Sequence, residues 1–162
     1  MSATILVVDD DPNIREALVI HLRNAGYQVQ TAKDGIEGGH AITRGRMLPY
    51  VMYIDPQLGR IGMTEEEARG KGLSIKVATM PMNYISRAVE IDESRGFMKA
   101  IVDAQTGQIL GAAVLGIEGG ELMSMIEIAM MGKVHYTVLK DAIFAHPTLA
   151  EAFNNLFGNF KS

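Results

Sequence analysis

The fold class of this chain is decided by one stretch, Phe97-Met98-Lys99-Ala100-Ile101-Val102-Asp103-Ala104-Gln105-Thr106-Gly107-Gln108-Ile109-Leu110-Gly111-Ala112-Ala113-Val114-Leu115. It holds two apolar runs, Phe97–Val102 and Ile109–Leu115, on either side of a polar segment. Apolar runs of this length that are bounded by turn residues are typical of buried strands. Gly107 suits a left-handed turn position, which residues with a side chain rarely adopt. The stretch therefore predicts an antiparallel β-hairpin.

Strand and helix signals on both sides of the hairpin extend the same architecture. Thr64 and Glu67 have the spacing of a capping box, which marks the start of a helix. Strands followed by helices predict an α+β fold, an antiparallel sheet with helices packed on one face. The elements expected are strands at Tyr50–Ile54 and Ile75–Thr79, and helices from Thr64, from about Gly120 to Met131 and from about Thr148 to Phe157.

The beginning of the chain carries a different pattern, a flavodoxin-like β-α-β unit. Ile5–Val8 is a continuous apolar run, typical of a strand that is buried on both faces of a parallel sheet. Asp11 is expected to cap a helix that starts at Pro12 and ends near Gly26. Tyr27–Ala32 then alternates as a second strand. A lone unit of this kind has open edges, so we predict that it docks elsewhere.

The segment Lys33–Met47 separates these two patterns. Its glycines, at 35, 38, 39 and 45, make it a poor helix and a plausible junction. We therefore expect two domains, residues 1–40 and residues 41–162. The strand Tyr50–Ile54 follows the junction at a distance that would let it lie beside Ile5–Val8, so the first unit is also expected to extend a sheet shared with the second.

Composition limits the function classes. The chain has 162 residues, 48% of them hydrophobic and 21% charged, with a formal net charge of -4 and a pI near 5.5. The weakly acidic balance and scattered lysines and arginines argue against a nucleic-acid partner. There are no cysteines, which excludes disulfides, thiolate metal sites and dithiol redox chemistry within this polypeptide. Without a basic leader or a long apolar run, the sequence predicts a cytoplasmic protein and no membrane partner.

Five segments in order carry a resemblance to a known enzyme family. They are Leu48-Pro49-Tyr50-Val51-Met52-Tyr53-Ile54-Asp55-Pro56-Gln57-Leu58-Gly59-Arg60-Ile61-Gly62-Met63-Thr64-Glu65, then Arg87-Ala88, the turn from Asp103 to Gly111, Gly119-Gly120-Glu121 and His146-Pro147-Thr148-Leu149-Ala150-Glu151. Together they resemble the C-terminal dimerisation domain of FAD-dependent pyridine nucleotide-disulfide oxidoreductases, including mercuric reductase-like and dihydrolipoamide dehydrogenase-like members. The resemblance covers residues from about 44 to 157.

This resemblance implies a homodimer and a catalytic pair. In the family, the histidine of the His-Pro-Thr-x-x-Glu segment is a general acid/base for a thiol of the partner subunit, and the glutamate orients its ring. His146 and Glu151 occupy those positions. The parent family uses FAD and NAD(P), but the chain shows neither a Cys-x4-Cys pair nor a Gly-x-Gly-x-x-Gly segment after a strand. We therefore expect no cofactor in this chain and a vestigial pair, although Thr148 and Glu151 also have the spacing of a capping box.

A second resemblance covers residues from about 3 to 37. The segments Ile5-Leu6-Val7-Val8-Asp9-Asp10-Asp11-Pro12, Gly26-Tyr27 and Lys33-Asp34-Gly35 are similar to the first β-α-β of a response-regulator receiver domain. In receivers the first acidic pair, Asp9 and Asp10 here, holds Mg²⁺ beside a phosphorylated aspartate. Asp55 ends a strand at about the right distance for that aspartate, but its neighbours fit the reductase motif. The alternative for the acidic run is that it caps the following helix.

The two resemblances together predict a chimera joined between Gly35 and Thr43, by natural fusion or by construction. The helix at Gly120–Met131 is expected to turn one apolar face to the core, with Leu122, Met125, Ile126, Ala129 and Met130. Its apolar surface extends beyond that face at Met123, Ile128 and Met131, which suggests a second cover from a partner subunit or, alternatively, from the N-terminal unit. We expect a homodimerising module without catalysis of its own. The alternatives are an oxidoreductase fragment that supplies His146 and Glu151 in trans, and a degenerate phosphorelay receiver. His21, His40 and His135 show no ligand spacing and are expected to be ordinary surface or helix-face residues.

Overall fold

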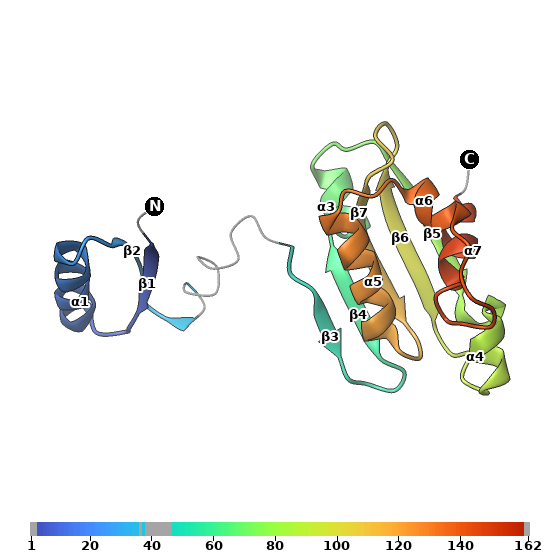
Figure 1. Cartoon of the computed structure of the whole chain (residues 1–162), viewed down its shortest axis with the longest axis horizontal. Helices are drawn as coiled ribbons and strands as arrows, with labels where there is room; N and C mark the ends of the chain where they lie inside the picture. The colour runs from blue at the N-terminus through green and yellow to red at the C-terminus, as the bar shows by residue number, and fades with distance from the viewer. Residues whose placement is uncertain (1–2, 36, 38–46, 161–162) are drawn as a thin grey trace. The chain divides into compact units, whose positions relative to one another are not determined.

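The computed structural model describes residues 3–35, 37 and 47–160 (Figure 1). The chain divides into two compact units, Met1–Met47 and Leu48–Ser162, which we call the N-terminal unit and the C-terminal unit. The expected junction between Gly35 and Thr43 falls almost wholly outside the described residues. Within the described part of the chain, no helix is both long and apolar enough to cross a bilayer.

The N-terminal unit is a β-α-β unit, as predicted. Strands β1 (Thr4–Val8) and β2 (Gln28–Ala32) pair in parallel, and α1 (Pro12–Asn24) connects them. Asp11 caps α1 by accepting hydrogen bonds from the amides of Asn13 and Ile14, at 2.8 and 3.4 Å. This arrangement satisfies two of the backbone donors that a helix start leaves without an intrahelical partner.

Two predictions for this unit are wrong. The strand β1 is not buried on both faces, because Val7 is its only buried residue and Val8 is exposed. Nor does the segment at Tyr50 lie beside it, since β3 (Tyr50–Met52) pairs with β4 (Leu58–Gly62) in another sheet. The reason is local: the turn after β3 brings β4 back antiparallel, whereas a parallel neighbour needs a longer crossover.

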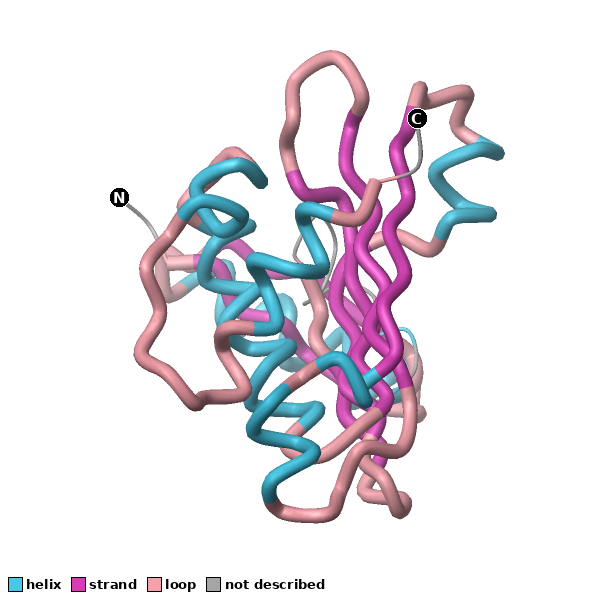
Figure 2. Tube along the Cα trace, turned by 90° about the vertical axis from the view of Figure 1, so that its right-hand side faces the viewer, coloured by secondary structure: helices cyan, strands magenta, loops and turns pink. Residues whose placement is uncertain are grey.

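The C-terminal unit is built on a five-stranded antiparallel sheet in the order β3-β4-β7-β6-β5 (Figures 1 and 2). Strands β6 (Phe97–Asp103) and β7 (Ile109–Leu115) form the predicted hairpin, and Gly107 takes a left-handed φ of 67°. At the edge, β5 (Ile75–Pro81) pairs with β6. The strand β4 had no prediction, because its glycine at 59 and arginine at 60 weaken the apolar pattern.

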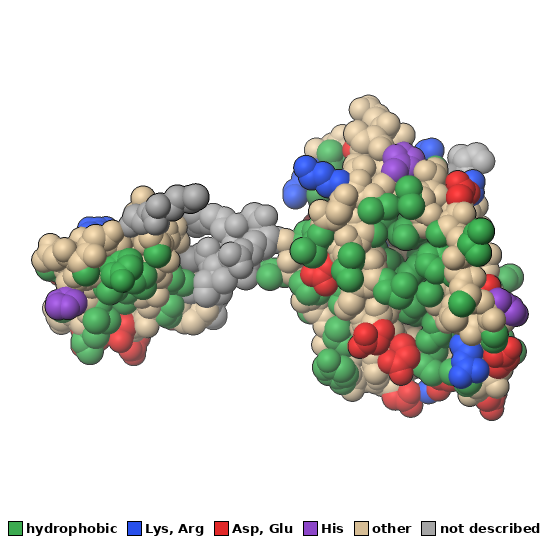
Figure 3. Space-filling model, viewed as in Figure 1, with side chains coloured by type: hydrophobic (Ala, Val, Ile, Leu, Met, Phe, Trp, Pro, Cys, Tyr) green, Lys and Arg blue, Asp and Glu red, His purple; other side chains and the backbone are tan. Residues whose placement is uncertain are grey.

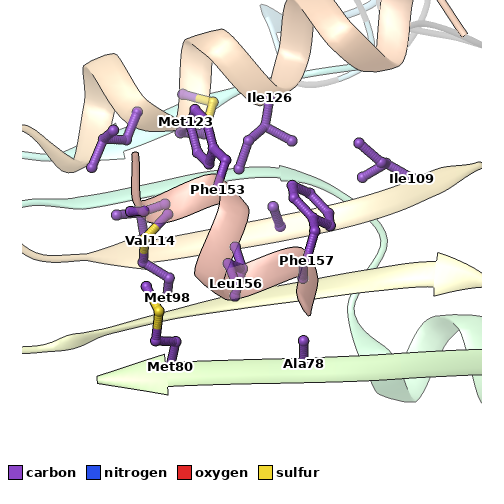
Figure 4. Packing of buried hydrophobic residues seen from close by; sticks show 14 of the residues in the cluster. Ala78, Met80, Met98, Ile109, Val114, Met123, Ile126, Phe153, Leu156 and Phe157 are labelled. Carbon is purple, nitrogen blue, oxygen red and sulfur yellow. The ribbon is translucent and has the colours of Figure 1, made fainter. Parts of the chain in front are cut away.

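Helices cover one face of this sheet and close the core, so the predicted α+β architecture is confirmed. Figure 4 shows Phe153 of α7 beside Met123 of α5, with Leu156 over the strands. All three side chains are fully buried. The helices are α3 (Glu65–Gly70), α4 (Ser86–Glu90), α5 (Gly119–Met131), α6 (Tyr136–Asp141) and α7 (Ala152–Gly158), with a 3-10 turn at Met82–Tyr84.

The helix boundaries agree with the sequence except at the last helix. The capping box of Thr64 and Glu67 is present in full. By contrast α7 begins at Ala152, four residues after the predicted start at Thr148. The hydroxyl of Thr148 donates to the carbonyl of Ala145 at 2.8 Å instead of accepting from a helix amide. Only the glutamate half of the predicted capping box is present, because Oε2 of Glu151 accepts the amide of Thr148 at 3.2 Å while the Thr148 hydroxyl caps no helix amide.

Candidate functional site

The His-Pro-Thr-x-x-Glu segment forms a hydrogen-bonded pair of side chains. Nδ1 of His146 lies 2.9 Å from Oε2 and 3.1 Å from Oε1 of Glu151. A carboxylate only accepts, so Nδ1 carries the proton and the lone pair of the neutral ring is at Nε2. The His146 side chain is 65% exposed and that of Glu151 is 27% exposed. The geometry gives an accessible nitrogen base whose ring is held by a carboxylate, which suits proton exchange with an outside group.

The same glutamate also fixes the backbone between the two residues. Oε2 of Glu151 accepts the amide of Thr148 at 3.2 Å. The segment therefore loops over its own glutamate, with His146 on one side and Thr148 on the other. A side chain that orders both the ring and the following backbone is well placed to set the direction of the ring.

Two contacts that the sequence did not reveal attach the residues before His146, from the end of α6 to Phe144, to α7. Nδ2 of Asn154 donates to three backbone carbonyls at the end of α6, those of Leu139, Lys140 and Ala142, at 3.0, 2.8 and 2.9 Å. The ring of Phe144 packs edge-on against Phe153, with centroids 5.9 Å apart. An asparagine in the first turns of a helix carries no sequence signal that names its distant partners. The contact between Asn154 and the end of α6 becomes visible only when α6 and α7 pack together.

His135 is not the passive surface residue that its spacing suggested. It is the N-cap of α6, and its Nδ1 lies 3.3 Å from the amide of Thr137. A side chain added at Gly107 would begin 1.7 Å from Nε2 of His135, so the ring lies directly on the hairpin turn. Glycine is therefore required there for space as well as for its backbone conformation. His21 is exposed at the end of α1, and His40 lies outside the described residues.

The acidic residues singled out for metal or phosphate chemistry lie in both units. Oδ1 of Asp9 accepts the amide of Asp11 at 2.8 Å, and its carbonyl accepts from Nη1 of Arg15 at 2.6 Å. Asp9 is half-buried, and Asp10 beside it is exposed. Among the residues with a described placement, no three His, Asp or Glu side chains gather as a metal site. The contacts of Asp9 and the capping by Asp11 favour the helix-capping alternative for the acidic run.

Asp55 is tied into an ion-pair cluster in the C-terminal unit. Its Oδ1 lies 2.7 Å from Nη2 of Arg95, and its side chain is 82% exposed. Arg95 also pairs with Glu93, and this hydrogen bond lowers the pKa of the Glu93 carboxyl below its ordinary value. The same contacts, first with Glu93 and then with Asp55, raise the pKa of Arg95. The cluster joins the turn after β3 to the loop before β6, which is a structural task for Asp55.

The outer face of α5 is apolar, although not with the residues expected. Met123 was expected on the second face but is buried in the core, while Met125 of the expected core face is 41% exposed. Ile128 and Met131 are 70% and 67% exposed. Figure 3 shows apolar side chains gathered on the side of the C-terminal unit where α5 lies in Figure 1. Because apolar residues on this face have no cover within the described chain, it is the leading candidate for a protein interface.

Comparison with known proteins identifies the C-terminal unit. Residues 48–157 match the sequence model of the pyridine nucleotide-disulphide oxidoreductase dimerisation domain. The chain belongs to this family. The predicted resemblance of this part of the chain is thus confirmed, and we refer to residues 48–157 as the dimerisation domain. No comparison supports the predicted receiver-like origin of the N-terminal unit, which stays a prediction.

Individual relatives agree with the family. A probable pyridine nucleotide-disulfide oxidoreductase, RclA of Escherichia coli, is 38% identical over 125 residues, which cover 77% of this chain and 28% of the relative. Dihydrolipoyl dehydrogenase of Vibrio parahaemolyticus is 32% identical over 126 residues, 78% of this chain and 26% of the enzyme. The solved structure of the HOCl-induced flavoprotein disulfide reductase RclA superimposes with a TM-score of 0.67 at 40% identity, over 68% of this chain and 26% of that one.

The chain spans about a quarter of the length of these relatives. The parent family uses FAD and NAD(P), but the hollow beside Glu151 does not fit either group. It is lined by Glu151 with residues of α7 and the turn before α4, and holds only about 90 Å³. A dinucleotide needs a larger cleft with backbone amides at a glycine-rich turn. We therefore derive no chemical step through a cofactor.

Proposed function

We propose that the chain is a homodimerising module without catalysis of its own. The observation that carries the proposal is the exposed apolar face of α5, on a domain whose family description is dimerisation. Met125, Ile128 and Met131 lie on the outward side of a helix whose inward side is buried in the core. Two copies related by a twofold axis would place this face against itself, as an isologous interface requires.

Burial of the apolar side chains on this face would stabilise a dimer. Complete burial of an Ile or Met side chain stabilises a contact by about 1.5–3 kcal/mol. Three partly exposed side chains from each copy offset a substantial share of the entropy lost on association. Methionine also adapts its shape to the opposing surface. These properties support α5 as the centre of the interface, with the polar residues around it as the rim.

Sedimentation equilibrium of the full chain tests the proposal. We expect a concentration-dependent dimer for the wild type and a monomer for Ile128→Glu, because the new carboxylate would be desolvated in the interface. Val89→Glu is the matched control, since Val89 is also an exposed apolar residue on a helix, α4, away from α5. A wild-type chain that remains monomeric at all concentrations would reject the proposal, and so would a dimeric Ile128→Glu.

A second candidate function is supported by the contact between His146 and Glu151. With Nε2 accessible and Nδ1 held at 2.9 Å from a carboxylate, the pair could exchange a proton with a thiol on a flavoprotein partner. Purified chain should then be assayed for flavin absorbance, and for NAD(P)H oxidation alone and after addition of a flavoprotein disulfide reductase that lacks its own histidine. A colourless sample that restores no oxidation would remove this candidate.

The remaining predictions concern the receiver-like resemblance, the domain boundary and the location of the protein. A receiver-like origin, a Mg²⁺ site at Asp9 and Asp10, phosphorylation and a domain boundary near residue 40 stay predictions, as does a cytoplasmic location. Incubation with acetyl phosphate and Mg²⁺, followed by intact-mass measurement, tests receiver function. Since Asp55, the candidate phosphoacceptor, is paired with Arg95 in the C-terminal unit, we expect no added phosphate.

A further inference from the structure

The segment that carries His146 is attached to α7 at three places. Asn154 holds the carbonyl of Ala142 at its start, the ring of Phe153 packs against Phe144 in its middle, and Glu151 holds its end. Between these attachments Ile143 is fully exposed and contributes no anchor. The position of the histidine ring thus depends on how firmly both ends of this segment are fixed.

The attachment by Asn154 is chemically specific. A helix C-terminus leaves its last four carbonyls without intrahelical donors, and α6 ends at Asp141 with the following residue extended. Three carbonyls converge on one amide NH2 group, at 3.0, 2.8 and 2.9 Å. All three only accept, so only the NH2 end of the Asn154 amide can face them. An aspartate of the same shape has no proton to donate here.

The two polar anchors lie almost next to each other on one element. Glu151 immediately precedes α7, and Asn154 lies in its first turn. Both ends of the His146 segment are therefore fixed to the same short piece of helix, whose Phe153 and Leu156 are fully buried in the core. Motion of the segment relative to Glu151 is limited by this common support, and the bond between His146 and Glu151 keeps its geometry.

We propose that Asn154 is a positioning residue for the His146–Glu151 pair. By holding the end of α6, it fixes the start of the segment so that Nδ1 of His146 meets the carboxylate and Nε2 is directed outward. This inference rests on the second candidate function, because positioning matters only if the pair exchanges protons. It does not depend on whether the chain forms a dimer.

The tautomer of the His146 ring reports this positioning directly. In the wild type, the hydrogen bond to Glu151 should hold the neutral ring in the Nδ1–H form. Long-range nitrogen–proton correlation spectra of the full chain, recorded where the ring is neutral, distinguish this form from the Nε2–H form. We expect Asn154→Asp to shift the nitrogen resonances of His146 toward the Nε2–H pattern, as Glu151→Ala should do completely.

Asn159→Asp is the matched control. Its Nδ2 donates to the carbonyl of Thr79 at 2.8 Å, so it loses the same kind of bond at the opposite end of α7. A role in general stability would make both variants behave alike, whereas a positioning role leaves His146 unchanged in Asn159→Asp. Asn154→Ala removes the donors without adding charge, and carries the test if Asn154→Asp does not fold.

Each outcome decides one point. A wild-type ring in the Nε2–H form would overturn the pair itself, and the positioning role with it. A wild-type ring in the Nδ1–H form that neither Asn154 variant disturbs would overturn the positioning role and leave the pair intact. Equal shifts in the Asn154 and Asn159 variants would reduce both asparagines to supports of the fold.

Discussion

The two units begin from similar apolar strands, but only the C-terminal unit encloses a core. In the described part of the N-terminal unit, only Val7, Val19 and Ala32 among the hydrophobic residues are buried. The C-terminal unit buries whole aromatic side chains, such as Phe153 and Phe157, between a five-stranded sheet and its helices. A pair of strands with one helix has too little apolar surface to offset the conformational entropy lost on folding. Similar local sequence patterns therefore form strands and helices in both units. Only the unit with a second packed layer buries enough apolar surface to stabilise its fold.

Truncation of a core aromatic should separate the two units most strongly. We expect Phe153→Ala to destabilise the C-terminal unit by about 3–5 kcal/mol, through lost burial and the cavity left behind. Leu18→Ala in α1 removes a side chain that is already exposed, so its cost should stay within about 1 kcal/mol. Urea unfolding followed by residue-resolved amide exchange measures each unit separately. Similar losses for both variants would contradict the comparison.

One glycine in each unit shows how closely the backbone is packed there. A Cβ at Gly59 would lie 2.3 Å from the carbonyl oxygen of Gly119, so Gly59→Ala must displace α5 from β4 and should cost about 1–3 kcal/mol. A Cβ at Gly26 meets nothing within 4 Å, so Gly26→Ala should cost only about 1 kcal/mol, for its left-handed backbone. Thermal unfolding measures both. Because asparagine tolerates that backbone, Gly26→Asn should recover most of the loss.

Removal of a helix N-cap should cost about the same free energy in either unit, but should disturb the N-terminal unit more. Asp11→Ala and Thr64→Ala each remove a side-chain acceptor from a helix start, at about 1 kcal/mol each. In the N-terminal unit this loss is a large share of the total free energy of unfolding, so the amides of α1 should lose their protection from exchange. In the C-terminal unit the amides of β6 should stay protected. Loss of protection in β6 after Thr64→Ala would show that the sheet depends on α3.

The smallest expected effect is a pH dependence of the hairpin turn. The amides of Thr106 and Gln105 donate to Asp103 and lower the pKa of its carboxyl. A depressed folded-state pKa gives stability that is present above the unfolded value, about 3.9 for aspartate, and is lost as the pH falls through the folded one. Asp103→Asn should remove this contribution. Amide exchange at the turn, compared between neutral and acidic pH, should then show a smaller pH effect in the variant.

Much of the fold was readable from the sequence, because its signals act over short distances. The hairpin with Gly107 at its turn, the capping box at Thr64 and Glu67, and the helix at α5 each follow from residues close together in the chain. His146 and Glu151 were likewise named from one motif, and they meet within one loop. The helix start predicted at Thr148 failed because its hydroxyl donates to the carbonyl of Ala145, three residues earlier, and does not accept from a helix amide.

What only the tertiary structure decided depends on segments that are distant in the sequence. The sheet order and the exposed side of α5 are settled by how whole elements pack, since only packing determines which side chains leave water. The bonds from Asn154 to the end of α6 exist because two helices meet. A sequence specifies which residues can donate, accept or be buried, whereas the fold determines which partner each one finds.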